Sequence, residues 1–187
     1  IRGDRFVAPI VVANARHADE VEEQFRTIEA SAGTLILEPM GRNTAPAIAL
    51  AAIAAGEGSA PLLVMPSDQV IANVDAFLEA VHAALPMVAE GWLATFGIAP
   101  DGPETGFGYV KVGDEIAPGV HRVARFVEKP ERAVAEAMVA SGDHAWNGGI
   151  FLFRADTYLE ALAEFAPEML AASRSANLSP IAFDWRL

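Results

Sequence analysis

The stretch LILEPMGRNTAPAIALAA, residues 35–52, joins an apolar run to an alanine-rich segment through a polar turn. The apolar run predicts a buried strand over residues 34–38, and the alanine-rich part predicts a helix over residues 45–56. Asn43 or Thr44 can cap that helix, because their side chains accept hydrogen bonds from free backbone N–H groups. The polarity of this turn makes it the first place to look for a binding site.

The composition is that of a globular domain. Hydrophobic residues make up 52% of the 187 residues and charged residues 20%. The formal net charge is −12 and there is no basic stripe, so we expect no nucleic-acid partner. The sequence has no cysteine, which excludes disulfides and thiolate metal sites and fits a cytoplasmic location. No apolar run reaches the roughly 20 residues that cross a bilayer, so we expect no membrane partner.

Apolar runs alternate with helical patterns along the chain. This alternation predicts an α/β fold with a mostly parallel mixed sheet that helices cover on both faces. The expected strands are residues 8–13, 34–38, 61–65, 92–98 and 120–128, followed by a loop and strand within WNGGIFLFR at 146–154. The expected helices are residues 18–31, 45–56, 74–90, 131–141 and 155–164.

Ligands of such sheets bind beyond the carboxyl ends of the strands, so the residues after each strand matter most. After the strand at 34–38, Glu38 offers two acceptors and Arg42 a planar cation, although a polar loop with a helix cap explains them equally simply. Asp68 follows an apolar strand, where a carboxylate can hold a divalent cation or can cap a short turn.

Later strand ends carry further polar groups. The glycines of DGPETGFGYVKVG, residues 101–113, allow close backbone approach to a ligand or an ordinary hairpin. Glu128 can accept hydrogen bonds from hydroxyl groups and Lys129 can meet a phosphate, or both can be solvated. Asn147 can bind hydroxyls or form a tight turn. The sequence has no Walker loop, zinc pattern or Ser/His/Asp signature.

Five segments, taken in order, resemble the bacterial mannose-1-phosphate guanylyltransferases, a branch of the sugar nucleotidyltransferases. They are EPMGRNTAPAIALAA, LLVMPSDQVI, TFGIAPDGPETGFGYVKVG, RFVEKP and WNGGIFLFRADTYLEAL. The resemblance runs from about residue 7 to about residue 170, and GRNTAPAIALAA is specific to the mannose branch. It implies a Rossmann-like three-layer sandwich of the nucleotide-diphospho-sugar transferase type, as a single nucleotidyltransferase domain over residues 1–187.

The resemblance also implies a reaction. Mannose 1-phosphate attacks the α-phosphorus of GTP, which gives GDP-mannose and pyrophosphate. Mg²⁺ offsets the charge of the phosphates, so that catalysis is mostly positioning and electrostatics. A homodimer is compatible with the family.

The family motifs place individual residues in the site. Glu38 lies beside guanine, where its carboxylate could accept from N1–H and N2–H₂ together, a donor pair that thymine and uracil lack. Asp68 matches the magnesium ligand, and Lys129 matches the position that contacts the sugar phosphate; both count as catalytic. The full nucleotide-binding set is Glu38, Arg42, Asn43, Thr44, Ala45, Pro66 and Ser67. The sugar-binding set is Gly108, Tyr109, Glu128, Lys129, Asn147 and Gly148.

The sequence also departs from the family pattern. Gln69 stands where many relatives carry histidine. The family's glycine-rich triphosphate loop precedes the position of IRGDRF, and its second metal aspartate follows AFDWRL, so we expect a domain incomplete at the N-terminus and after about residue 177. The rival interpretations are a nucleotidyltransferase for another sugar 1-phosphate or base, a non-catalytic nucleotide-sugar-binding fragment, and an α/β domain with accidental matches.

Overall fold

The computed structural model describes residues 6–28, 33–41 and 43–176. It divides into two compact units, Ile1–Ala60 with Arg154–Leu187, and Pro61–Phe153. The single nucleotidyltransferase domain expected over residues 1–187 stays a prediction.

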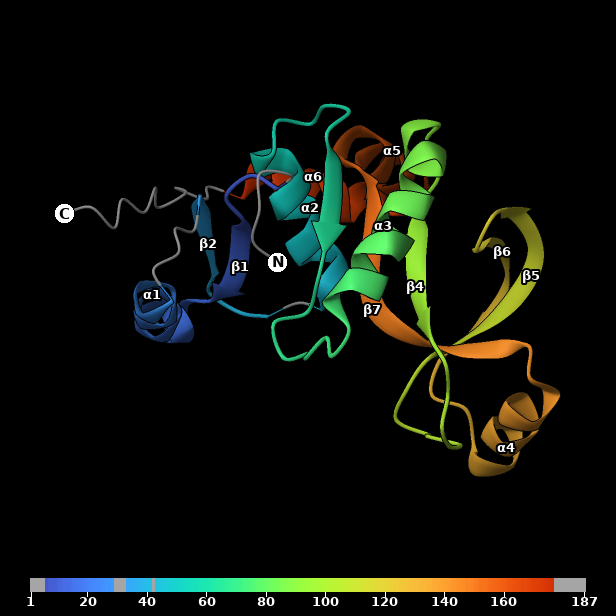
Figure 1. The fold of residues 1–187 in the computed structure, drawn as a ribbon. Helices are drawn as coiled ribbons and strands as arrows, with labels where there is room; N and C mark the ends of the chain where they lie inside the picture. The colour runs from blue at the N-terminus through green and yellow to red at the C-terminus, as the bar shows by residue number, and fades with distance from the viewer. Residues whose placement is uncertain (1–5, 29–32, 42, 177–187) are drawn as a thin grey trace. The chain divides into compact units, whose positions relative to one another are not determined.

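The first unit contains a parallel pair of strands (Figure 1). β1 (Ile10–Asn14) and β2 (Thr34–Glu38) pair in register from Ile10 opposite Thr34 to Asn14 opposite Glu38. The strands are joined by a short 3₁₀ turn and by α1, which begins the return connection that a parallel pair needs. The helices of this unit are α1 (Ala18–Thr27), α2 (Thr44–Ala54), α5 (Ala155–Phe165) and α6 (Pro167–Ser175).

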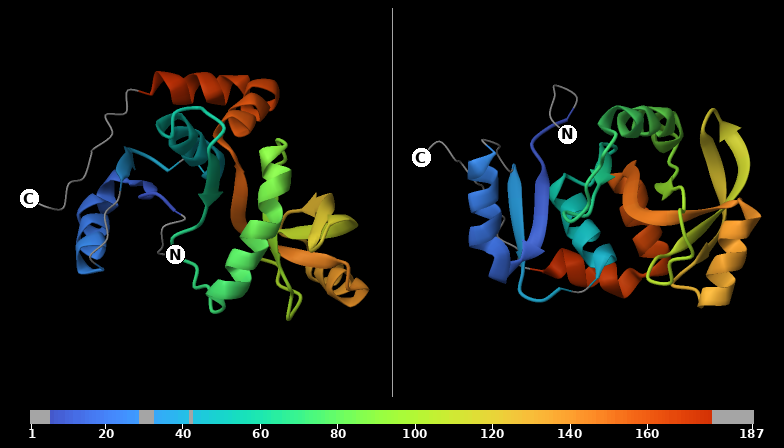
Figure 2. Two further views of the ribbon diagram at one scale, coloured as in Figure 1. Left: turned by 45° about the horizontal axis from the view of Figure 1, so that its top comes forward. Right: turned by 60° about the horizontal axis from the view of Figure 1, so that its bottom comes forward.

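The core of the first unit forms around α2. This helix is apolar on all sides, as expected of a helix that is surrounded by other elements. Ile48, Ala49 and Ala52 are buried on it, and Leu35 and Ile36 are buried on β2. α2 packs against both α5 and α6 (Figure 2). The start of α2 is therefore held on a rigid scaffold.

The second unit is built on a five-stranded sheet. Its strands are β3 (Pro61–Val64), β4 (Ala94–Ile98), β5 (Tyr109–Ala117), β6 (Val120–Val127) and β7 (His144–Arg154), with helices α3 (Val74–Ala89) and α4 (Arg132–Ser141). The strand order is β3-β7-β5-β6, and β4 also pairs with β7. β7 runs antiparallel to β4 and β5, and β5 and β6 form an antiparallel hairpin.

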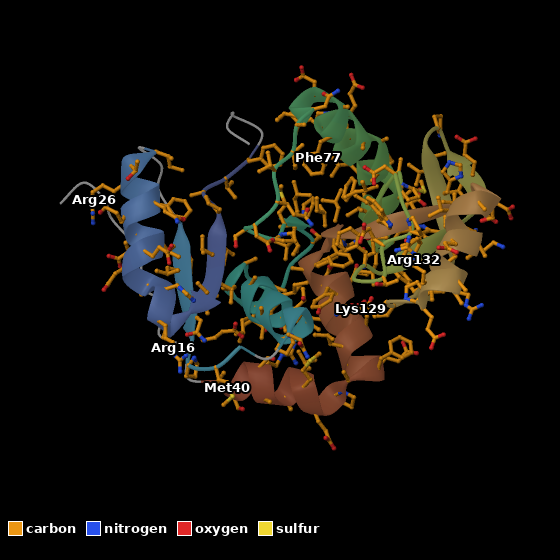
Figure 3. The ribbon with its side chains drawn as sticks, turned by 90° about the horizontal axis from the view of Figure 1, so that it is seen from below. Arg16, Arg26, Met40, Phe77, Lys129 and Arg132 are labelled. Atoms are coloured by element: carbon orange, nitrogen blue, oxygen red, sulfur yellow. The ribbon has the colours of Figure 1, made fainter. Side chains whose placement is uncertain are left out.

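Helix α3 covers one face of this sheet. Val81, Ala84 and Val88 pack on Leu152 of β7, and all four are buried. Phe77, labelled on α3 in Figure 3, meets Phe96 of β4 with 5.5 Å between ring centroids. Aromatic and aliphatic burial of this kind is the main stabilising contribution to a small domain. The strands that carry the sugar-binding predictions are thus firmly placed.

The predicted α/β class with a mixed sheet is confirmed. The strand at 34–38 has the predicted bounds, and the other predicted strands and helices are present with small shifts at their ends. The predicted helix 18–31 ends at Thr27, and residues 29–31 lie outside the described residues. No helix in the described ranges is both long and apolar enough to cross a membrane.

Three elements differ from the prediction. The loop expected at the start of WNGGIFLFR is part of strand β7, which already begins at His144, so Asn147 lies within the strand. Residues 109–117 form strand β5, where the sequence suggested a glycine-rich connection. A short turn with Gly119 at φ +72° joins β5 to β6, so this part of the sheet is antiparallel. Helix α6 was also missed, because only Ala166 separates its first residue, Pro167, from the end of α5.

Candidate active site

Three residues predicted for sugar binding meet at the start of β5. Gly108 precedes β5, Glu128 follows β6, and Asn147 lies in β7. Because Tyr109 at the start of β5 pairs with both neighbouring strands, these three positions are brought together. A Cβ atom built on Gly108 would lie 2.6 Å from Glu128 Oε2 and 3.6 Å from Asn147 Cβ. We call Gly108, Glu128, Lys129 and Asn147 the Gly108 cluster.

Backbone hydrogen bonds hold the Gly108 cluster together. Asn147 N donates to Gly108 O at 2.8 Å, and Lys129 N donates to Phe107 O at 3.2 Å. Lys129 has a φ of 43°, a left-handed conformation that non-glycine residues adopt at a cost of about 1–3 kcal/mol. The segment before β5 is therefore tied to the ends of both neighbouring strands.

The charges of the cluster are available to a ligand. Lys129 Nζ lies 3.8 Å from Glu128 Oε1, and the two side chains are 65% and 71% exposed. An exposed ion pair of this kind contributes about 0–1 kcal/mol, so a bound anion or hydroxyl can replace it at little cost. Arg132, which Figure 3 also labels, is instead paired with Glu136 of α4, with Arg132 Nε 3.0 Å from Glu136 Oε1.

Asn147 is held by its side-chain oxygen. Oδ1 accepts hydrogen bonds from Thr95 Oγ1 at 3.1 Å and from Gly149 N at 3.2 Å. Thr95 was not singled out from the sequence, although it lies within the family segment TFGI. The sequence placed Thr95 on an expected strand, 92–98, and the structure shows that this strand, β4, pairs with the strand that carries Asn147.

Two of the residues predicted for sugar binding, Tyr109 and Gly148, are buried. Tyr109 is fully buried, and its hydroxyl donates to Glu104 O at 2.9 Å, so its side chain belongs to the core. A Cβ atom on Gly148 would lie 3.1 Å from Ile98 Cδ1 and 3.2 Å from Phe96 O, so a side chain there would require these neighbours to shift. The carbonyl of Gly148 accepts from Gln69 Nε2 at 2.6 Å.

The loop after β3 is anchored beside the same glycines. The hydrogen bond from Gln69 ties it to Gly148, and Pro66 Cγ lies 3.4 Å from the position of a Cβ on Gly149. Asp68 and Ser67 in this loop are exposed. Sequence reasoning assigned Gln69 no role, whereas its amide now connects the Asp68 loop to the strand that carries Asn147.

Asp68 fits a magnesium ion whose ligands come partly from the protein and partly from a substrate. No group of three or more acidic, histidine or cysteine side chains forms a metal cage among the residues described. Mg²⁺ commonly binds through one or two carboxylates and the phosphates of a substrate, and it does not need a complete protein cage. A single exposed carboxylate after β3 is consistent with that mode.

Glu38 ends β2 in the first unit, opposite Asn14 at the end of β1. Burial raises the pKa of Glu38 above its ordinary value of 4.5. Because the pKa in the fold is higher than in the unfolded chain, the ionised carboxylate destabilises the fold at neutral pH. This cost is lost as the pH falls. Asn14 Oδ1 accepts from Arg16 N at 3.0 Å and is already engaged.

The start of α2 carries the other nucleotide-binding predictions of this unit. Asn43 precedes the helix with φ 70° and ψ −177°, and its side chain makes no capping hydrogen bond. The predicted cap by this side chain is therefore absent. Thr44 is exposed, and Ala45 O accepts from Tyr158 Oη at 3.0 Å. Burial raises the pKa of Tyr158 to about 12. Arg42 lies outside the described residues.

A second polar cluster surrounds Asp143 at the end of α4. Ser141, Lys111 and His144 all contact this carboxylate, at 2.5, 3.2 and 2.6 Å respectively. The hydrogen bonds from Ser141 and Lys111 lower the pKa of Asp143 to about 2. Ser141 and Asp143 both approach Nδ1 of His144, so the imidazole cannot relay a proton between them as in a Ser/His/Asp triad. This cluster joins α4 to β7.

Comparisons with known proteins identify the family of the chain. A family model described as nucleotidyl transferase matches residues 1–178. The mannose-1-phosphate guanylyltransferase ManC of Salmonella typhimurium is 48% identical over 185 aligned residues, which cover 94% of this chain and 38% of that protein. A mannose-1-phosphate guanylyltransferase of Escherichia coli strain K12 is 47% identical with the same coverage, 94% and 38%. The chain thus spans little more than a third of the length of these relatives, at 38%.

A solved structure shares the fold. The crystal structure described as mannose-6-phosphate isomerase from Helicobacter pylori matches with a TM-score of 0.79 and 33% sequence identity. The match covers 89% of this chain and 63% of that chain.

Proposed function

The chain belongs to the nucleotidyl transferase family, and from this we propose that it transfers the GMP unit of GTP to mannose 1-phosphate, which gives GDP-mannose and pyrophosphate. The observation that carries the proposal is the Gly108 cluster. It combines a carboxylate, an amide and an ammonium group around a backbone without a side chain. Relatives that are named mannose-1-phosphate guanylyltransferases, at 48% and 47% identity, favour mannose as the sugar.

The chemistry is a substitution at phosphorus. A phosphate oxygen of mannose 1-phosphate forms a bond to the α-phosphorus of GTP. The bond from that phosphorus to the bridging oxygen of the β-phosphate breaks, and pyrophosphate leaves with the electron pair. No covalent enzyme intermediate is needed, so the residues act by positioning the two substrates and by offsetting charge.

The sugar side of the site is assigned to the second unit. Glu128 accepts a hydrogen bond from one sugar hydroxyl, and Asn147 donates to another. The absence of a side chain at Gly108 leaves room for the Glu128 carboxylate against the backbone. Lys129 offsets the charge of the sugar phosphate as a compact cation. Because Lys129 directly follows Glu128, we assign hydroxyl recognition and phosphate recognition to adjacent residues.

The nucleotide-binding assignments follow the family motifs, some of which lie in the first unit and others in the loop after β3. Glu38 accepts from N1–H and N2–H₂ of guanine, and Asn43 or Thr44 contacts the base or ribose. Two features of Asn43 support a role in ligand binding. Its side chain makes no capping hydrogen bond, and its backbone is in a conformation that glycine would adopt with less strain. Pro66 and Ser67 border the nucleotide through the loop that Gln69 anchors.

Asp68 would hold Mg²⁺ together with phosphate oxygens of the substrate. The ion supplies positive charge that stabilises the phosphates during the transfer. The protein contributes the exposed carboxylate and the anchored loop that carries it.

The direct test is release of pyrophosphate from GTP and mannose 1-phosphate in the presence of MgCl₂. We expect turnover with this pair, and slower turnover when ATP, UTP or dTTP replaces GTP or when glucose 1-phosphate replaces the sugar. Faster turnover with another pair would change the assigned substrates. Binding of GDP-mannose in calorimetry without any pyrophosphate release would instead support a non-catalytic binding role.

A further inference from the structure

We propose that Thr95 is a positioning residue that locks the Asn147 amide so that its N–H₂ group faces the sugar. The residues that orient the amide all lie in the second unit. The identity of the ligand rests on the proposed function.

Gly149 decides which atom of the Asn147 amide is the oxygen. A backbone N–H can only donate, and Gly149 N lies 3.2 Å from Oδ1 of Asn147. The alternative amide orientation would place N–H₂ against N–H, with two donors facing each other. The assignment of Oδ1 therefore follows from hydrogen-bond chemistry and not from the shape of the amide, which is nearly symmetric.

The same atom then fixes the proton of Thr95. Thr95 Oγ1 lies 3.1 Å from Asn147 Oδ1 and 3.3 Å from Ile150 O. A hydroxyl has a single proton, and two acceptors cannot face each other at 3.1 Å without it. The proton is best placed toward Asn147, whose oxygen is the closer of the two and has no other side-chain donor among the described residues.

An irregularity in β7 brings the two side chains together. Thr95 pairs with Phe151, whereas Gly97, two residues later, pairs with Asn147, four residues earlier on β7. The extra residues of β7 lie at Gly148 and Gly149, and Gly149 has a φ of +65°. Bulges of this kind commonly change the direction of a side chain next to a functional site.

The locked amide gives the Gly108 cluster a defined polarity. With Oδ1 occupied twice, the two N–H groups of Nδ2 remain as donors, and within the described part of the chain no hydrogen bond is recorded from them. Glu128 presents only acceptors when it is ionised. The cluster therefore offers donors from one side and acceptors from the other, which suits two sugar hydroxyls of which one accepts and the other donates.

The test removes the Thr95 hydroxyl and keeps its shape. In Thr95→Val we expect the KM for mannose 1-phosphate to rise roughly three- to tenfold, as for loss of one neutral hydrogen bond, with the KM for GTP unchanged. Thr95→Ser keeps the hydroxyl and should restore most of the affinity. Thr34→Val makes the same change at a strand position in the first unit and should leave both constants unchanged.

A second readout does not depend on turnover. The side-chain N–H₂ signals of Asn147 in a ¹H–¹⁵N spectrum of the free protein can be assigned by their absence in Asn147→Ala. They should shift in Thr95→Val and return in Thr95→Ser. Unchanged signals in Thr95→Val would overturn the proposal, and so would a raised KM that Thr95→Ser does not restore. If wild-type protein releases no pyrophosphate, the proposed function fails, and the spectra alone still decide whether Thr95 positions the amide.

Discussion

Replacing Gly108 by alanine should weaken sugar binding with little effect on the stability of the fold. The added methyl group would lie 2.6 Å from Glu128 Oε2, well inside van der Waals contact. The next nearest atoms, Asn147 Cβ and Glu128 Cδ, are at ordinary contact distances of 3.6 and 3.7 Å. The carboxylate of Glu128 is therefore the group that must move, and its side chain is 71% exposed.

The change in stability and the change in sugar binding are expected to have different sizes. Rotating Glu128 away costs about 0.5–1.5 kcal/mol if the new rotamer is imperfect. Alanine stabilises the fold by about 0.4–1 kcal/mol because it restricts the unfolded chain, and it can adopt the native backbone here because Gly108 does not have a left-handed φ. The free energy of unfolding should thus stay within about 1 kcal/mol of wild type. Loss of a hydrogen bond from a sugar hydroxyl to a carboxylate costs about 1.5–3 kcal/mol, or roughly a 10- to 150-fold rise in the KM for mannose 1-phosphate.

The assay combines pyrophosphate-release kinetics with thermal unfolding. Gly102→Ala is the matched control, because it lies in the segment before β5 and a Cβ there meets nothing within 4 Å. Adding Glu128→Ala to Gly108→Ala should raise the KM little further, since both changes remove the same contact. A sugar KM within twofold of wild type in Gly108→Ala would refute the role of the carboxylate. A loss of more than about 2 kcal/mol in stability would refute the claim that Glu128 is free to move.

Four further substitutions separate the other assigned roles. Asp68→Ala should leave the melting temperature unchanged, because the side chain is exposed, but should lower kcat by about 100-fold or more; near-normal turnover at saturating MgCl₂ would exclude a metal role. Lys129→Ala should raise the KM for mannose 1-phosphate about tenfold and leave the KM for GTP unchanged, as initial-rate kinetics would show. Glu38→Gln should narrow the preference for GTP over ATP and UTP. In wild type the KM for GTP should already rise as the pH is lowered toward 4.5, because burial raises the pKa of Glu38 and its carboxylate is protonated earlier than an ordinary one. A KM for GTP that stays constant down to pH 4.5 would contradict this. Tyr158→Phe removes the hydrogen bond to Ala45 O, so chemical denaturation should show a loss of about 1 kcal/mol and the KM for GTP, not for the sugar, should rise.

Local sequence patterns predicted most of the elements, because each element has its own period of apolar residues. β2 and α3 illustrate this, since their buried residues follow the pattern that the sequence shows. β5 was missed because its apolar residues come after three glycines, which resemble a turn when read without their partner strands. The pairing of β5 with both β6 and β7 is a long-range property, and no local pattern specifies it.

The site shows the same division between local and distant information. Motifs placed Glu128 and Asn147 at strand ends, and the structure brings these two together around Gly108. The contacts that orient them come from residues far away in the chain, such as Thr95, which lies 52 positions from Asn147, and Gln69, which lies 79 positions from Gly148. The sequence cannot show such contacts, because an uncharged side chain on a neighbouring strand has no signature of its own.

The polar turn after β2 and the loop after β6 share an unfavourable backbone conformation. In both, a carboxylate lies at the end of the strand or directly after it, Glu38 in β2 and Glu128 after β6. A non-glycine residue with positive φ then comes before the next helix, Asn43 at 70° and Lys129 at 43°. Glycine would adopt either conformation without strain, so the fold alone favours glycine at both positions. Glu57 also has a positive φ, of 54°, but its side chain pairs with Arg174 at 2.7 Å and so has a structural explanation. Asn43 makes no capping bond, and the contact of Lys129 with Glu128 is long at 3.8 Å and exposed. The side chains at these two positions are therefore retained at a cost to stability that the fold does not repay, as expected of residues that meet a substrate.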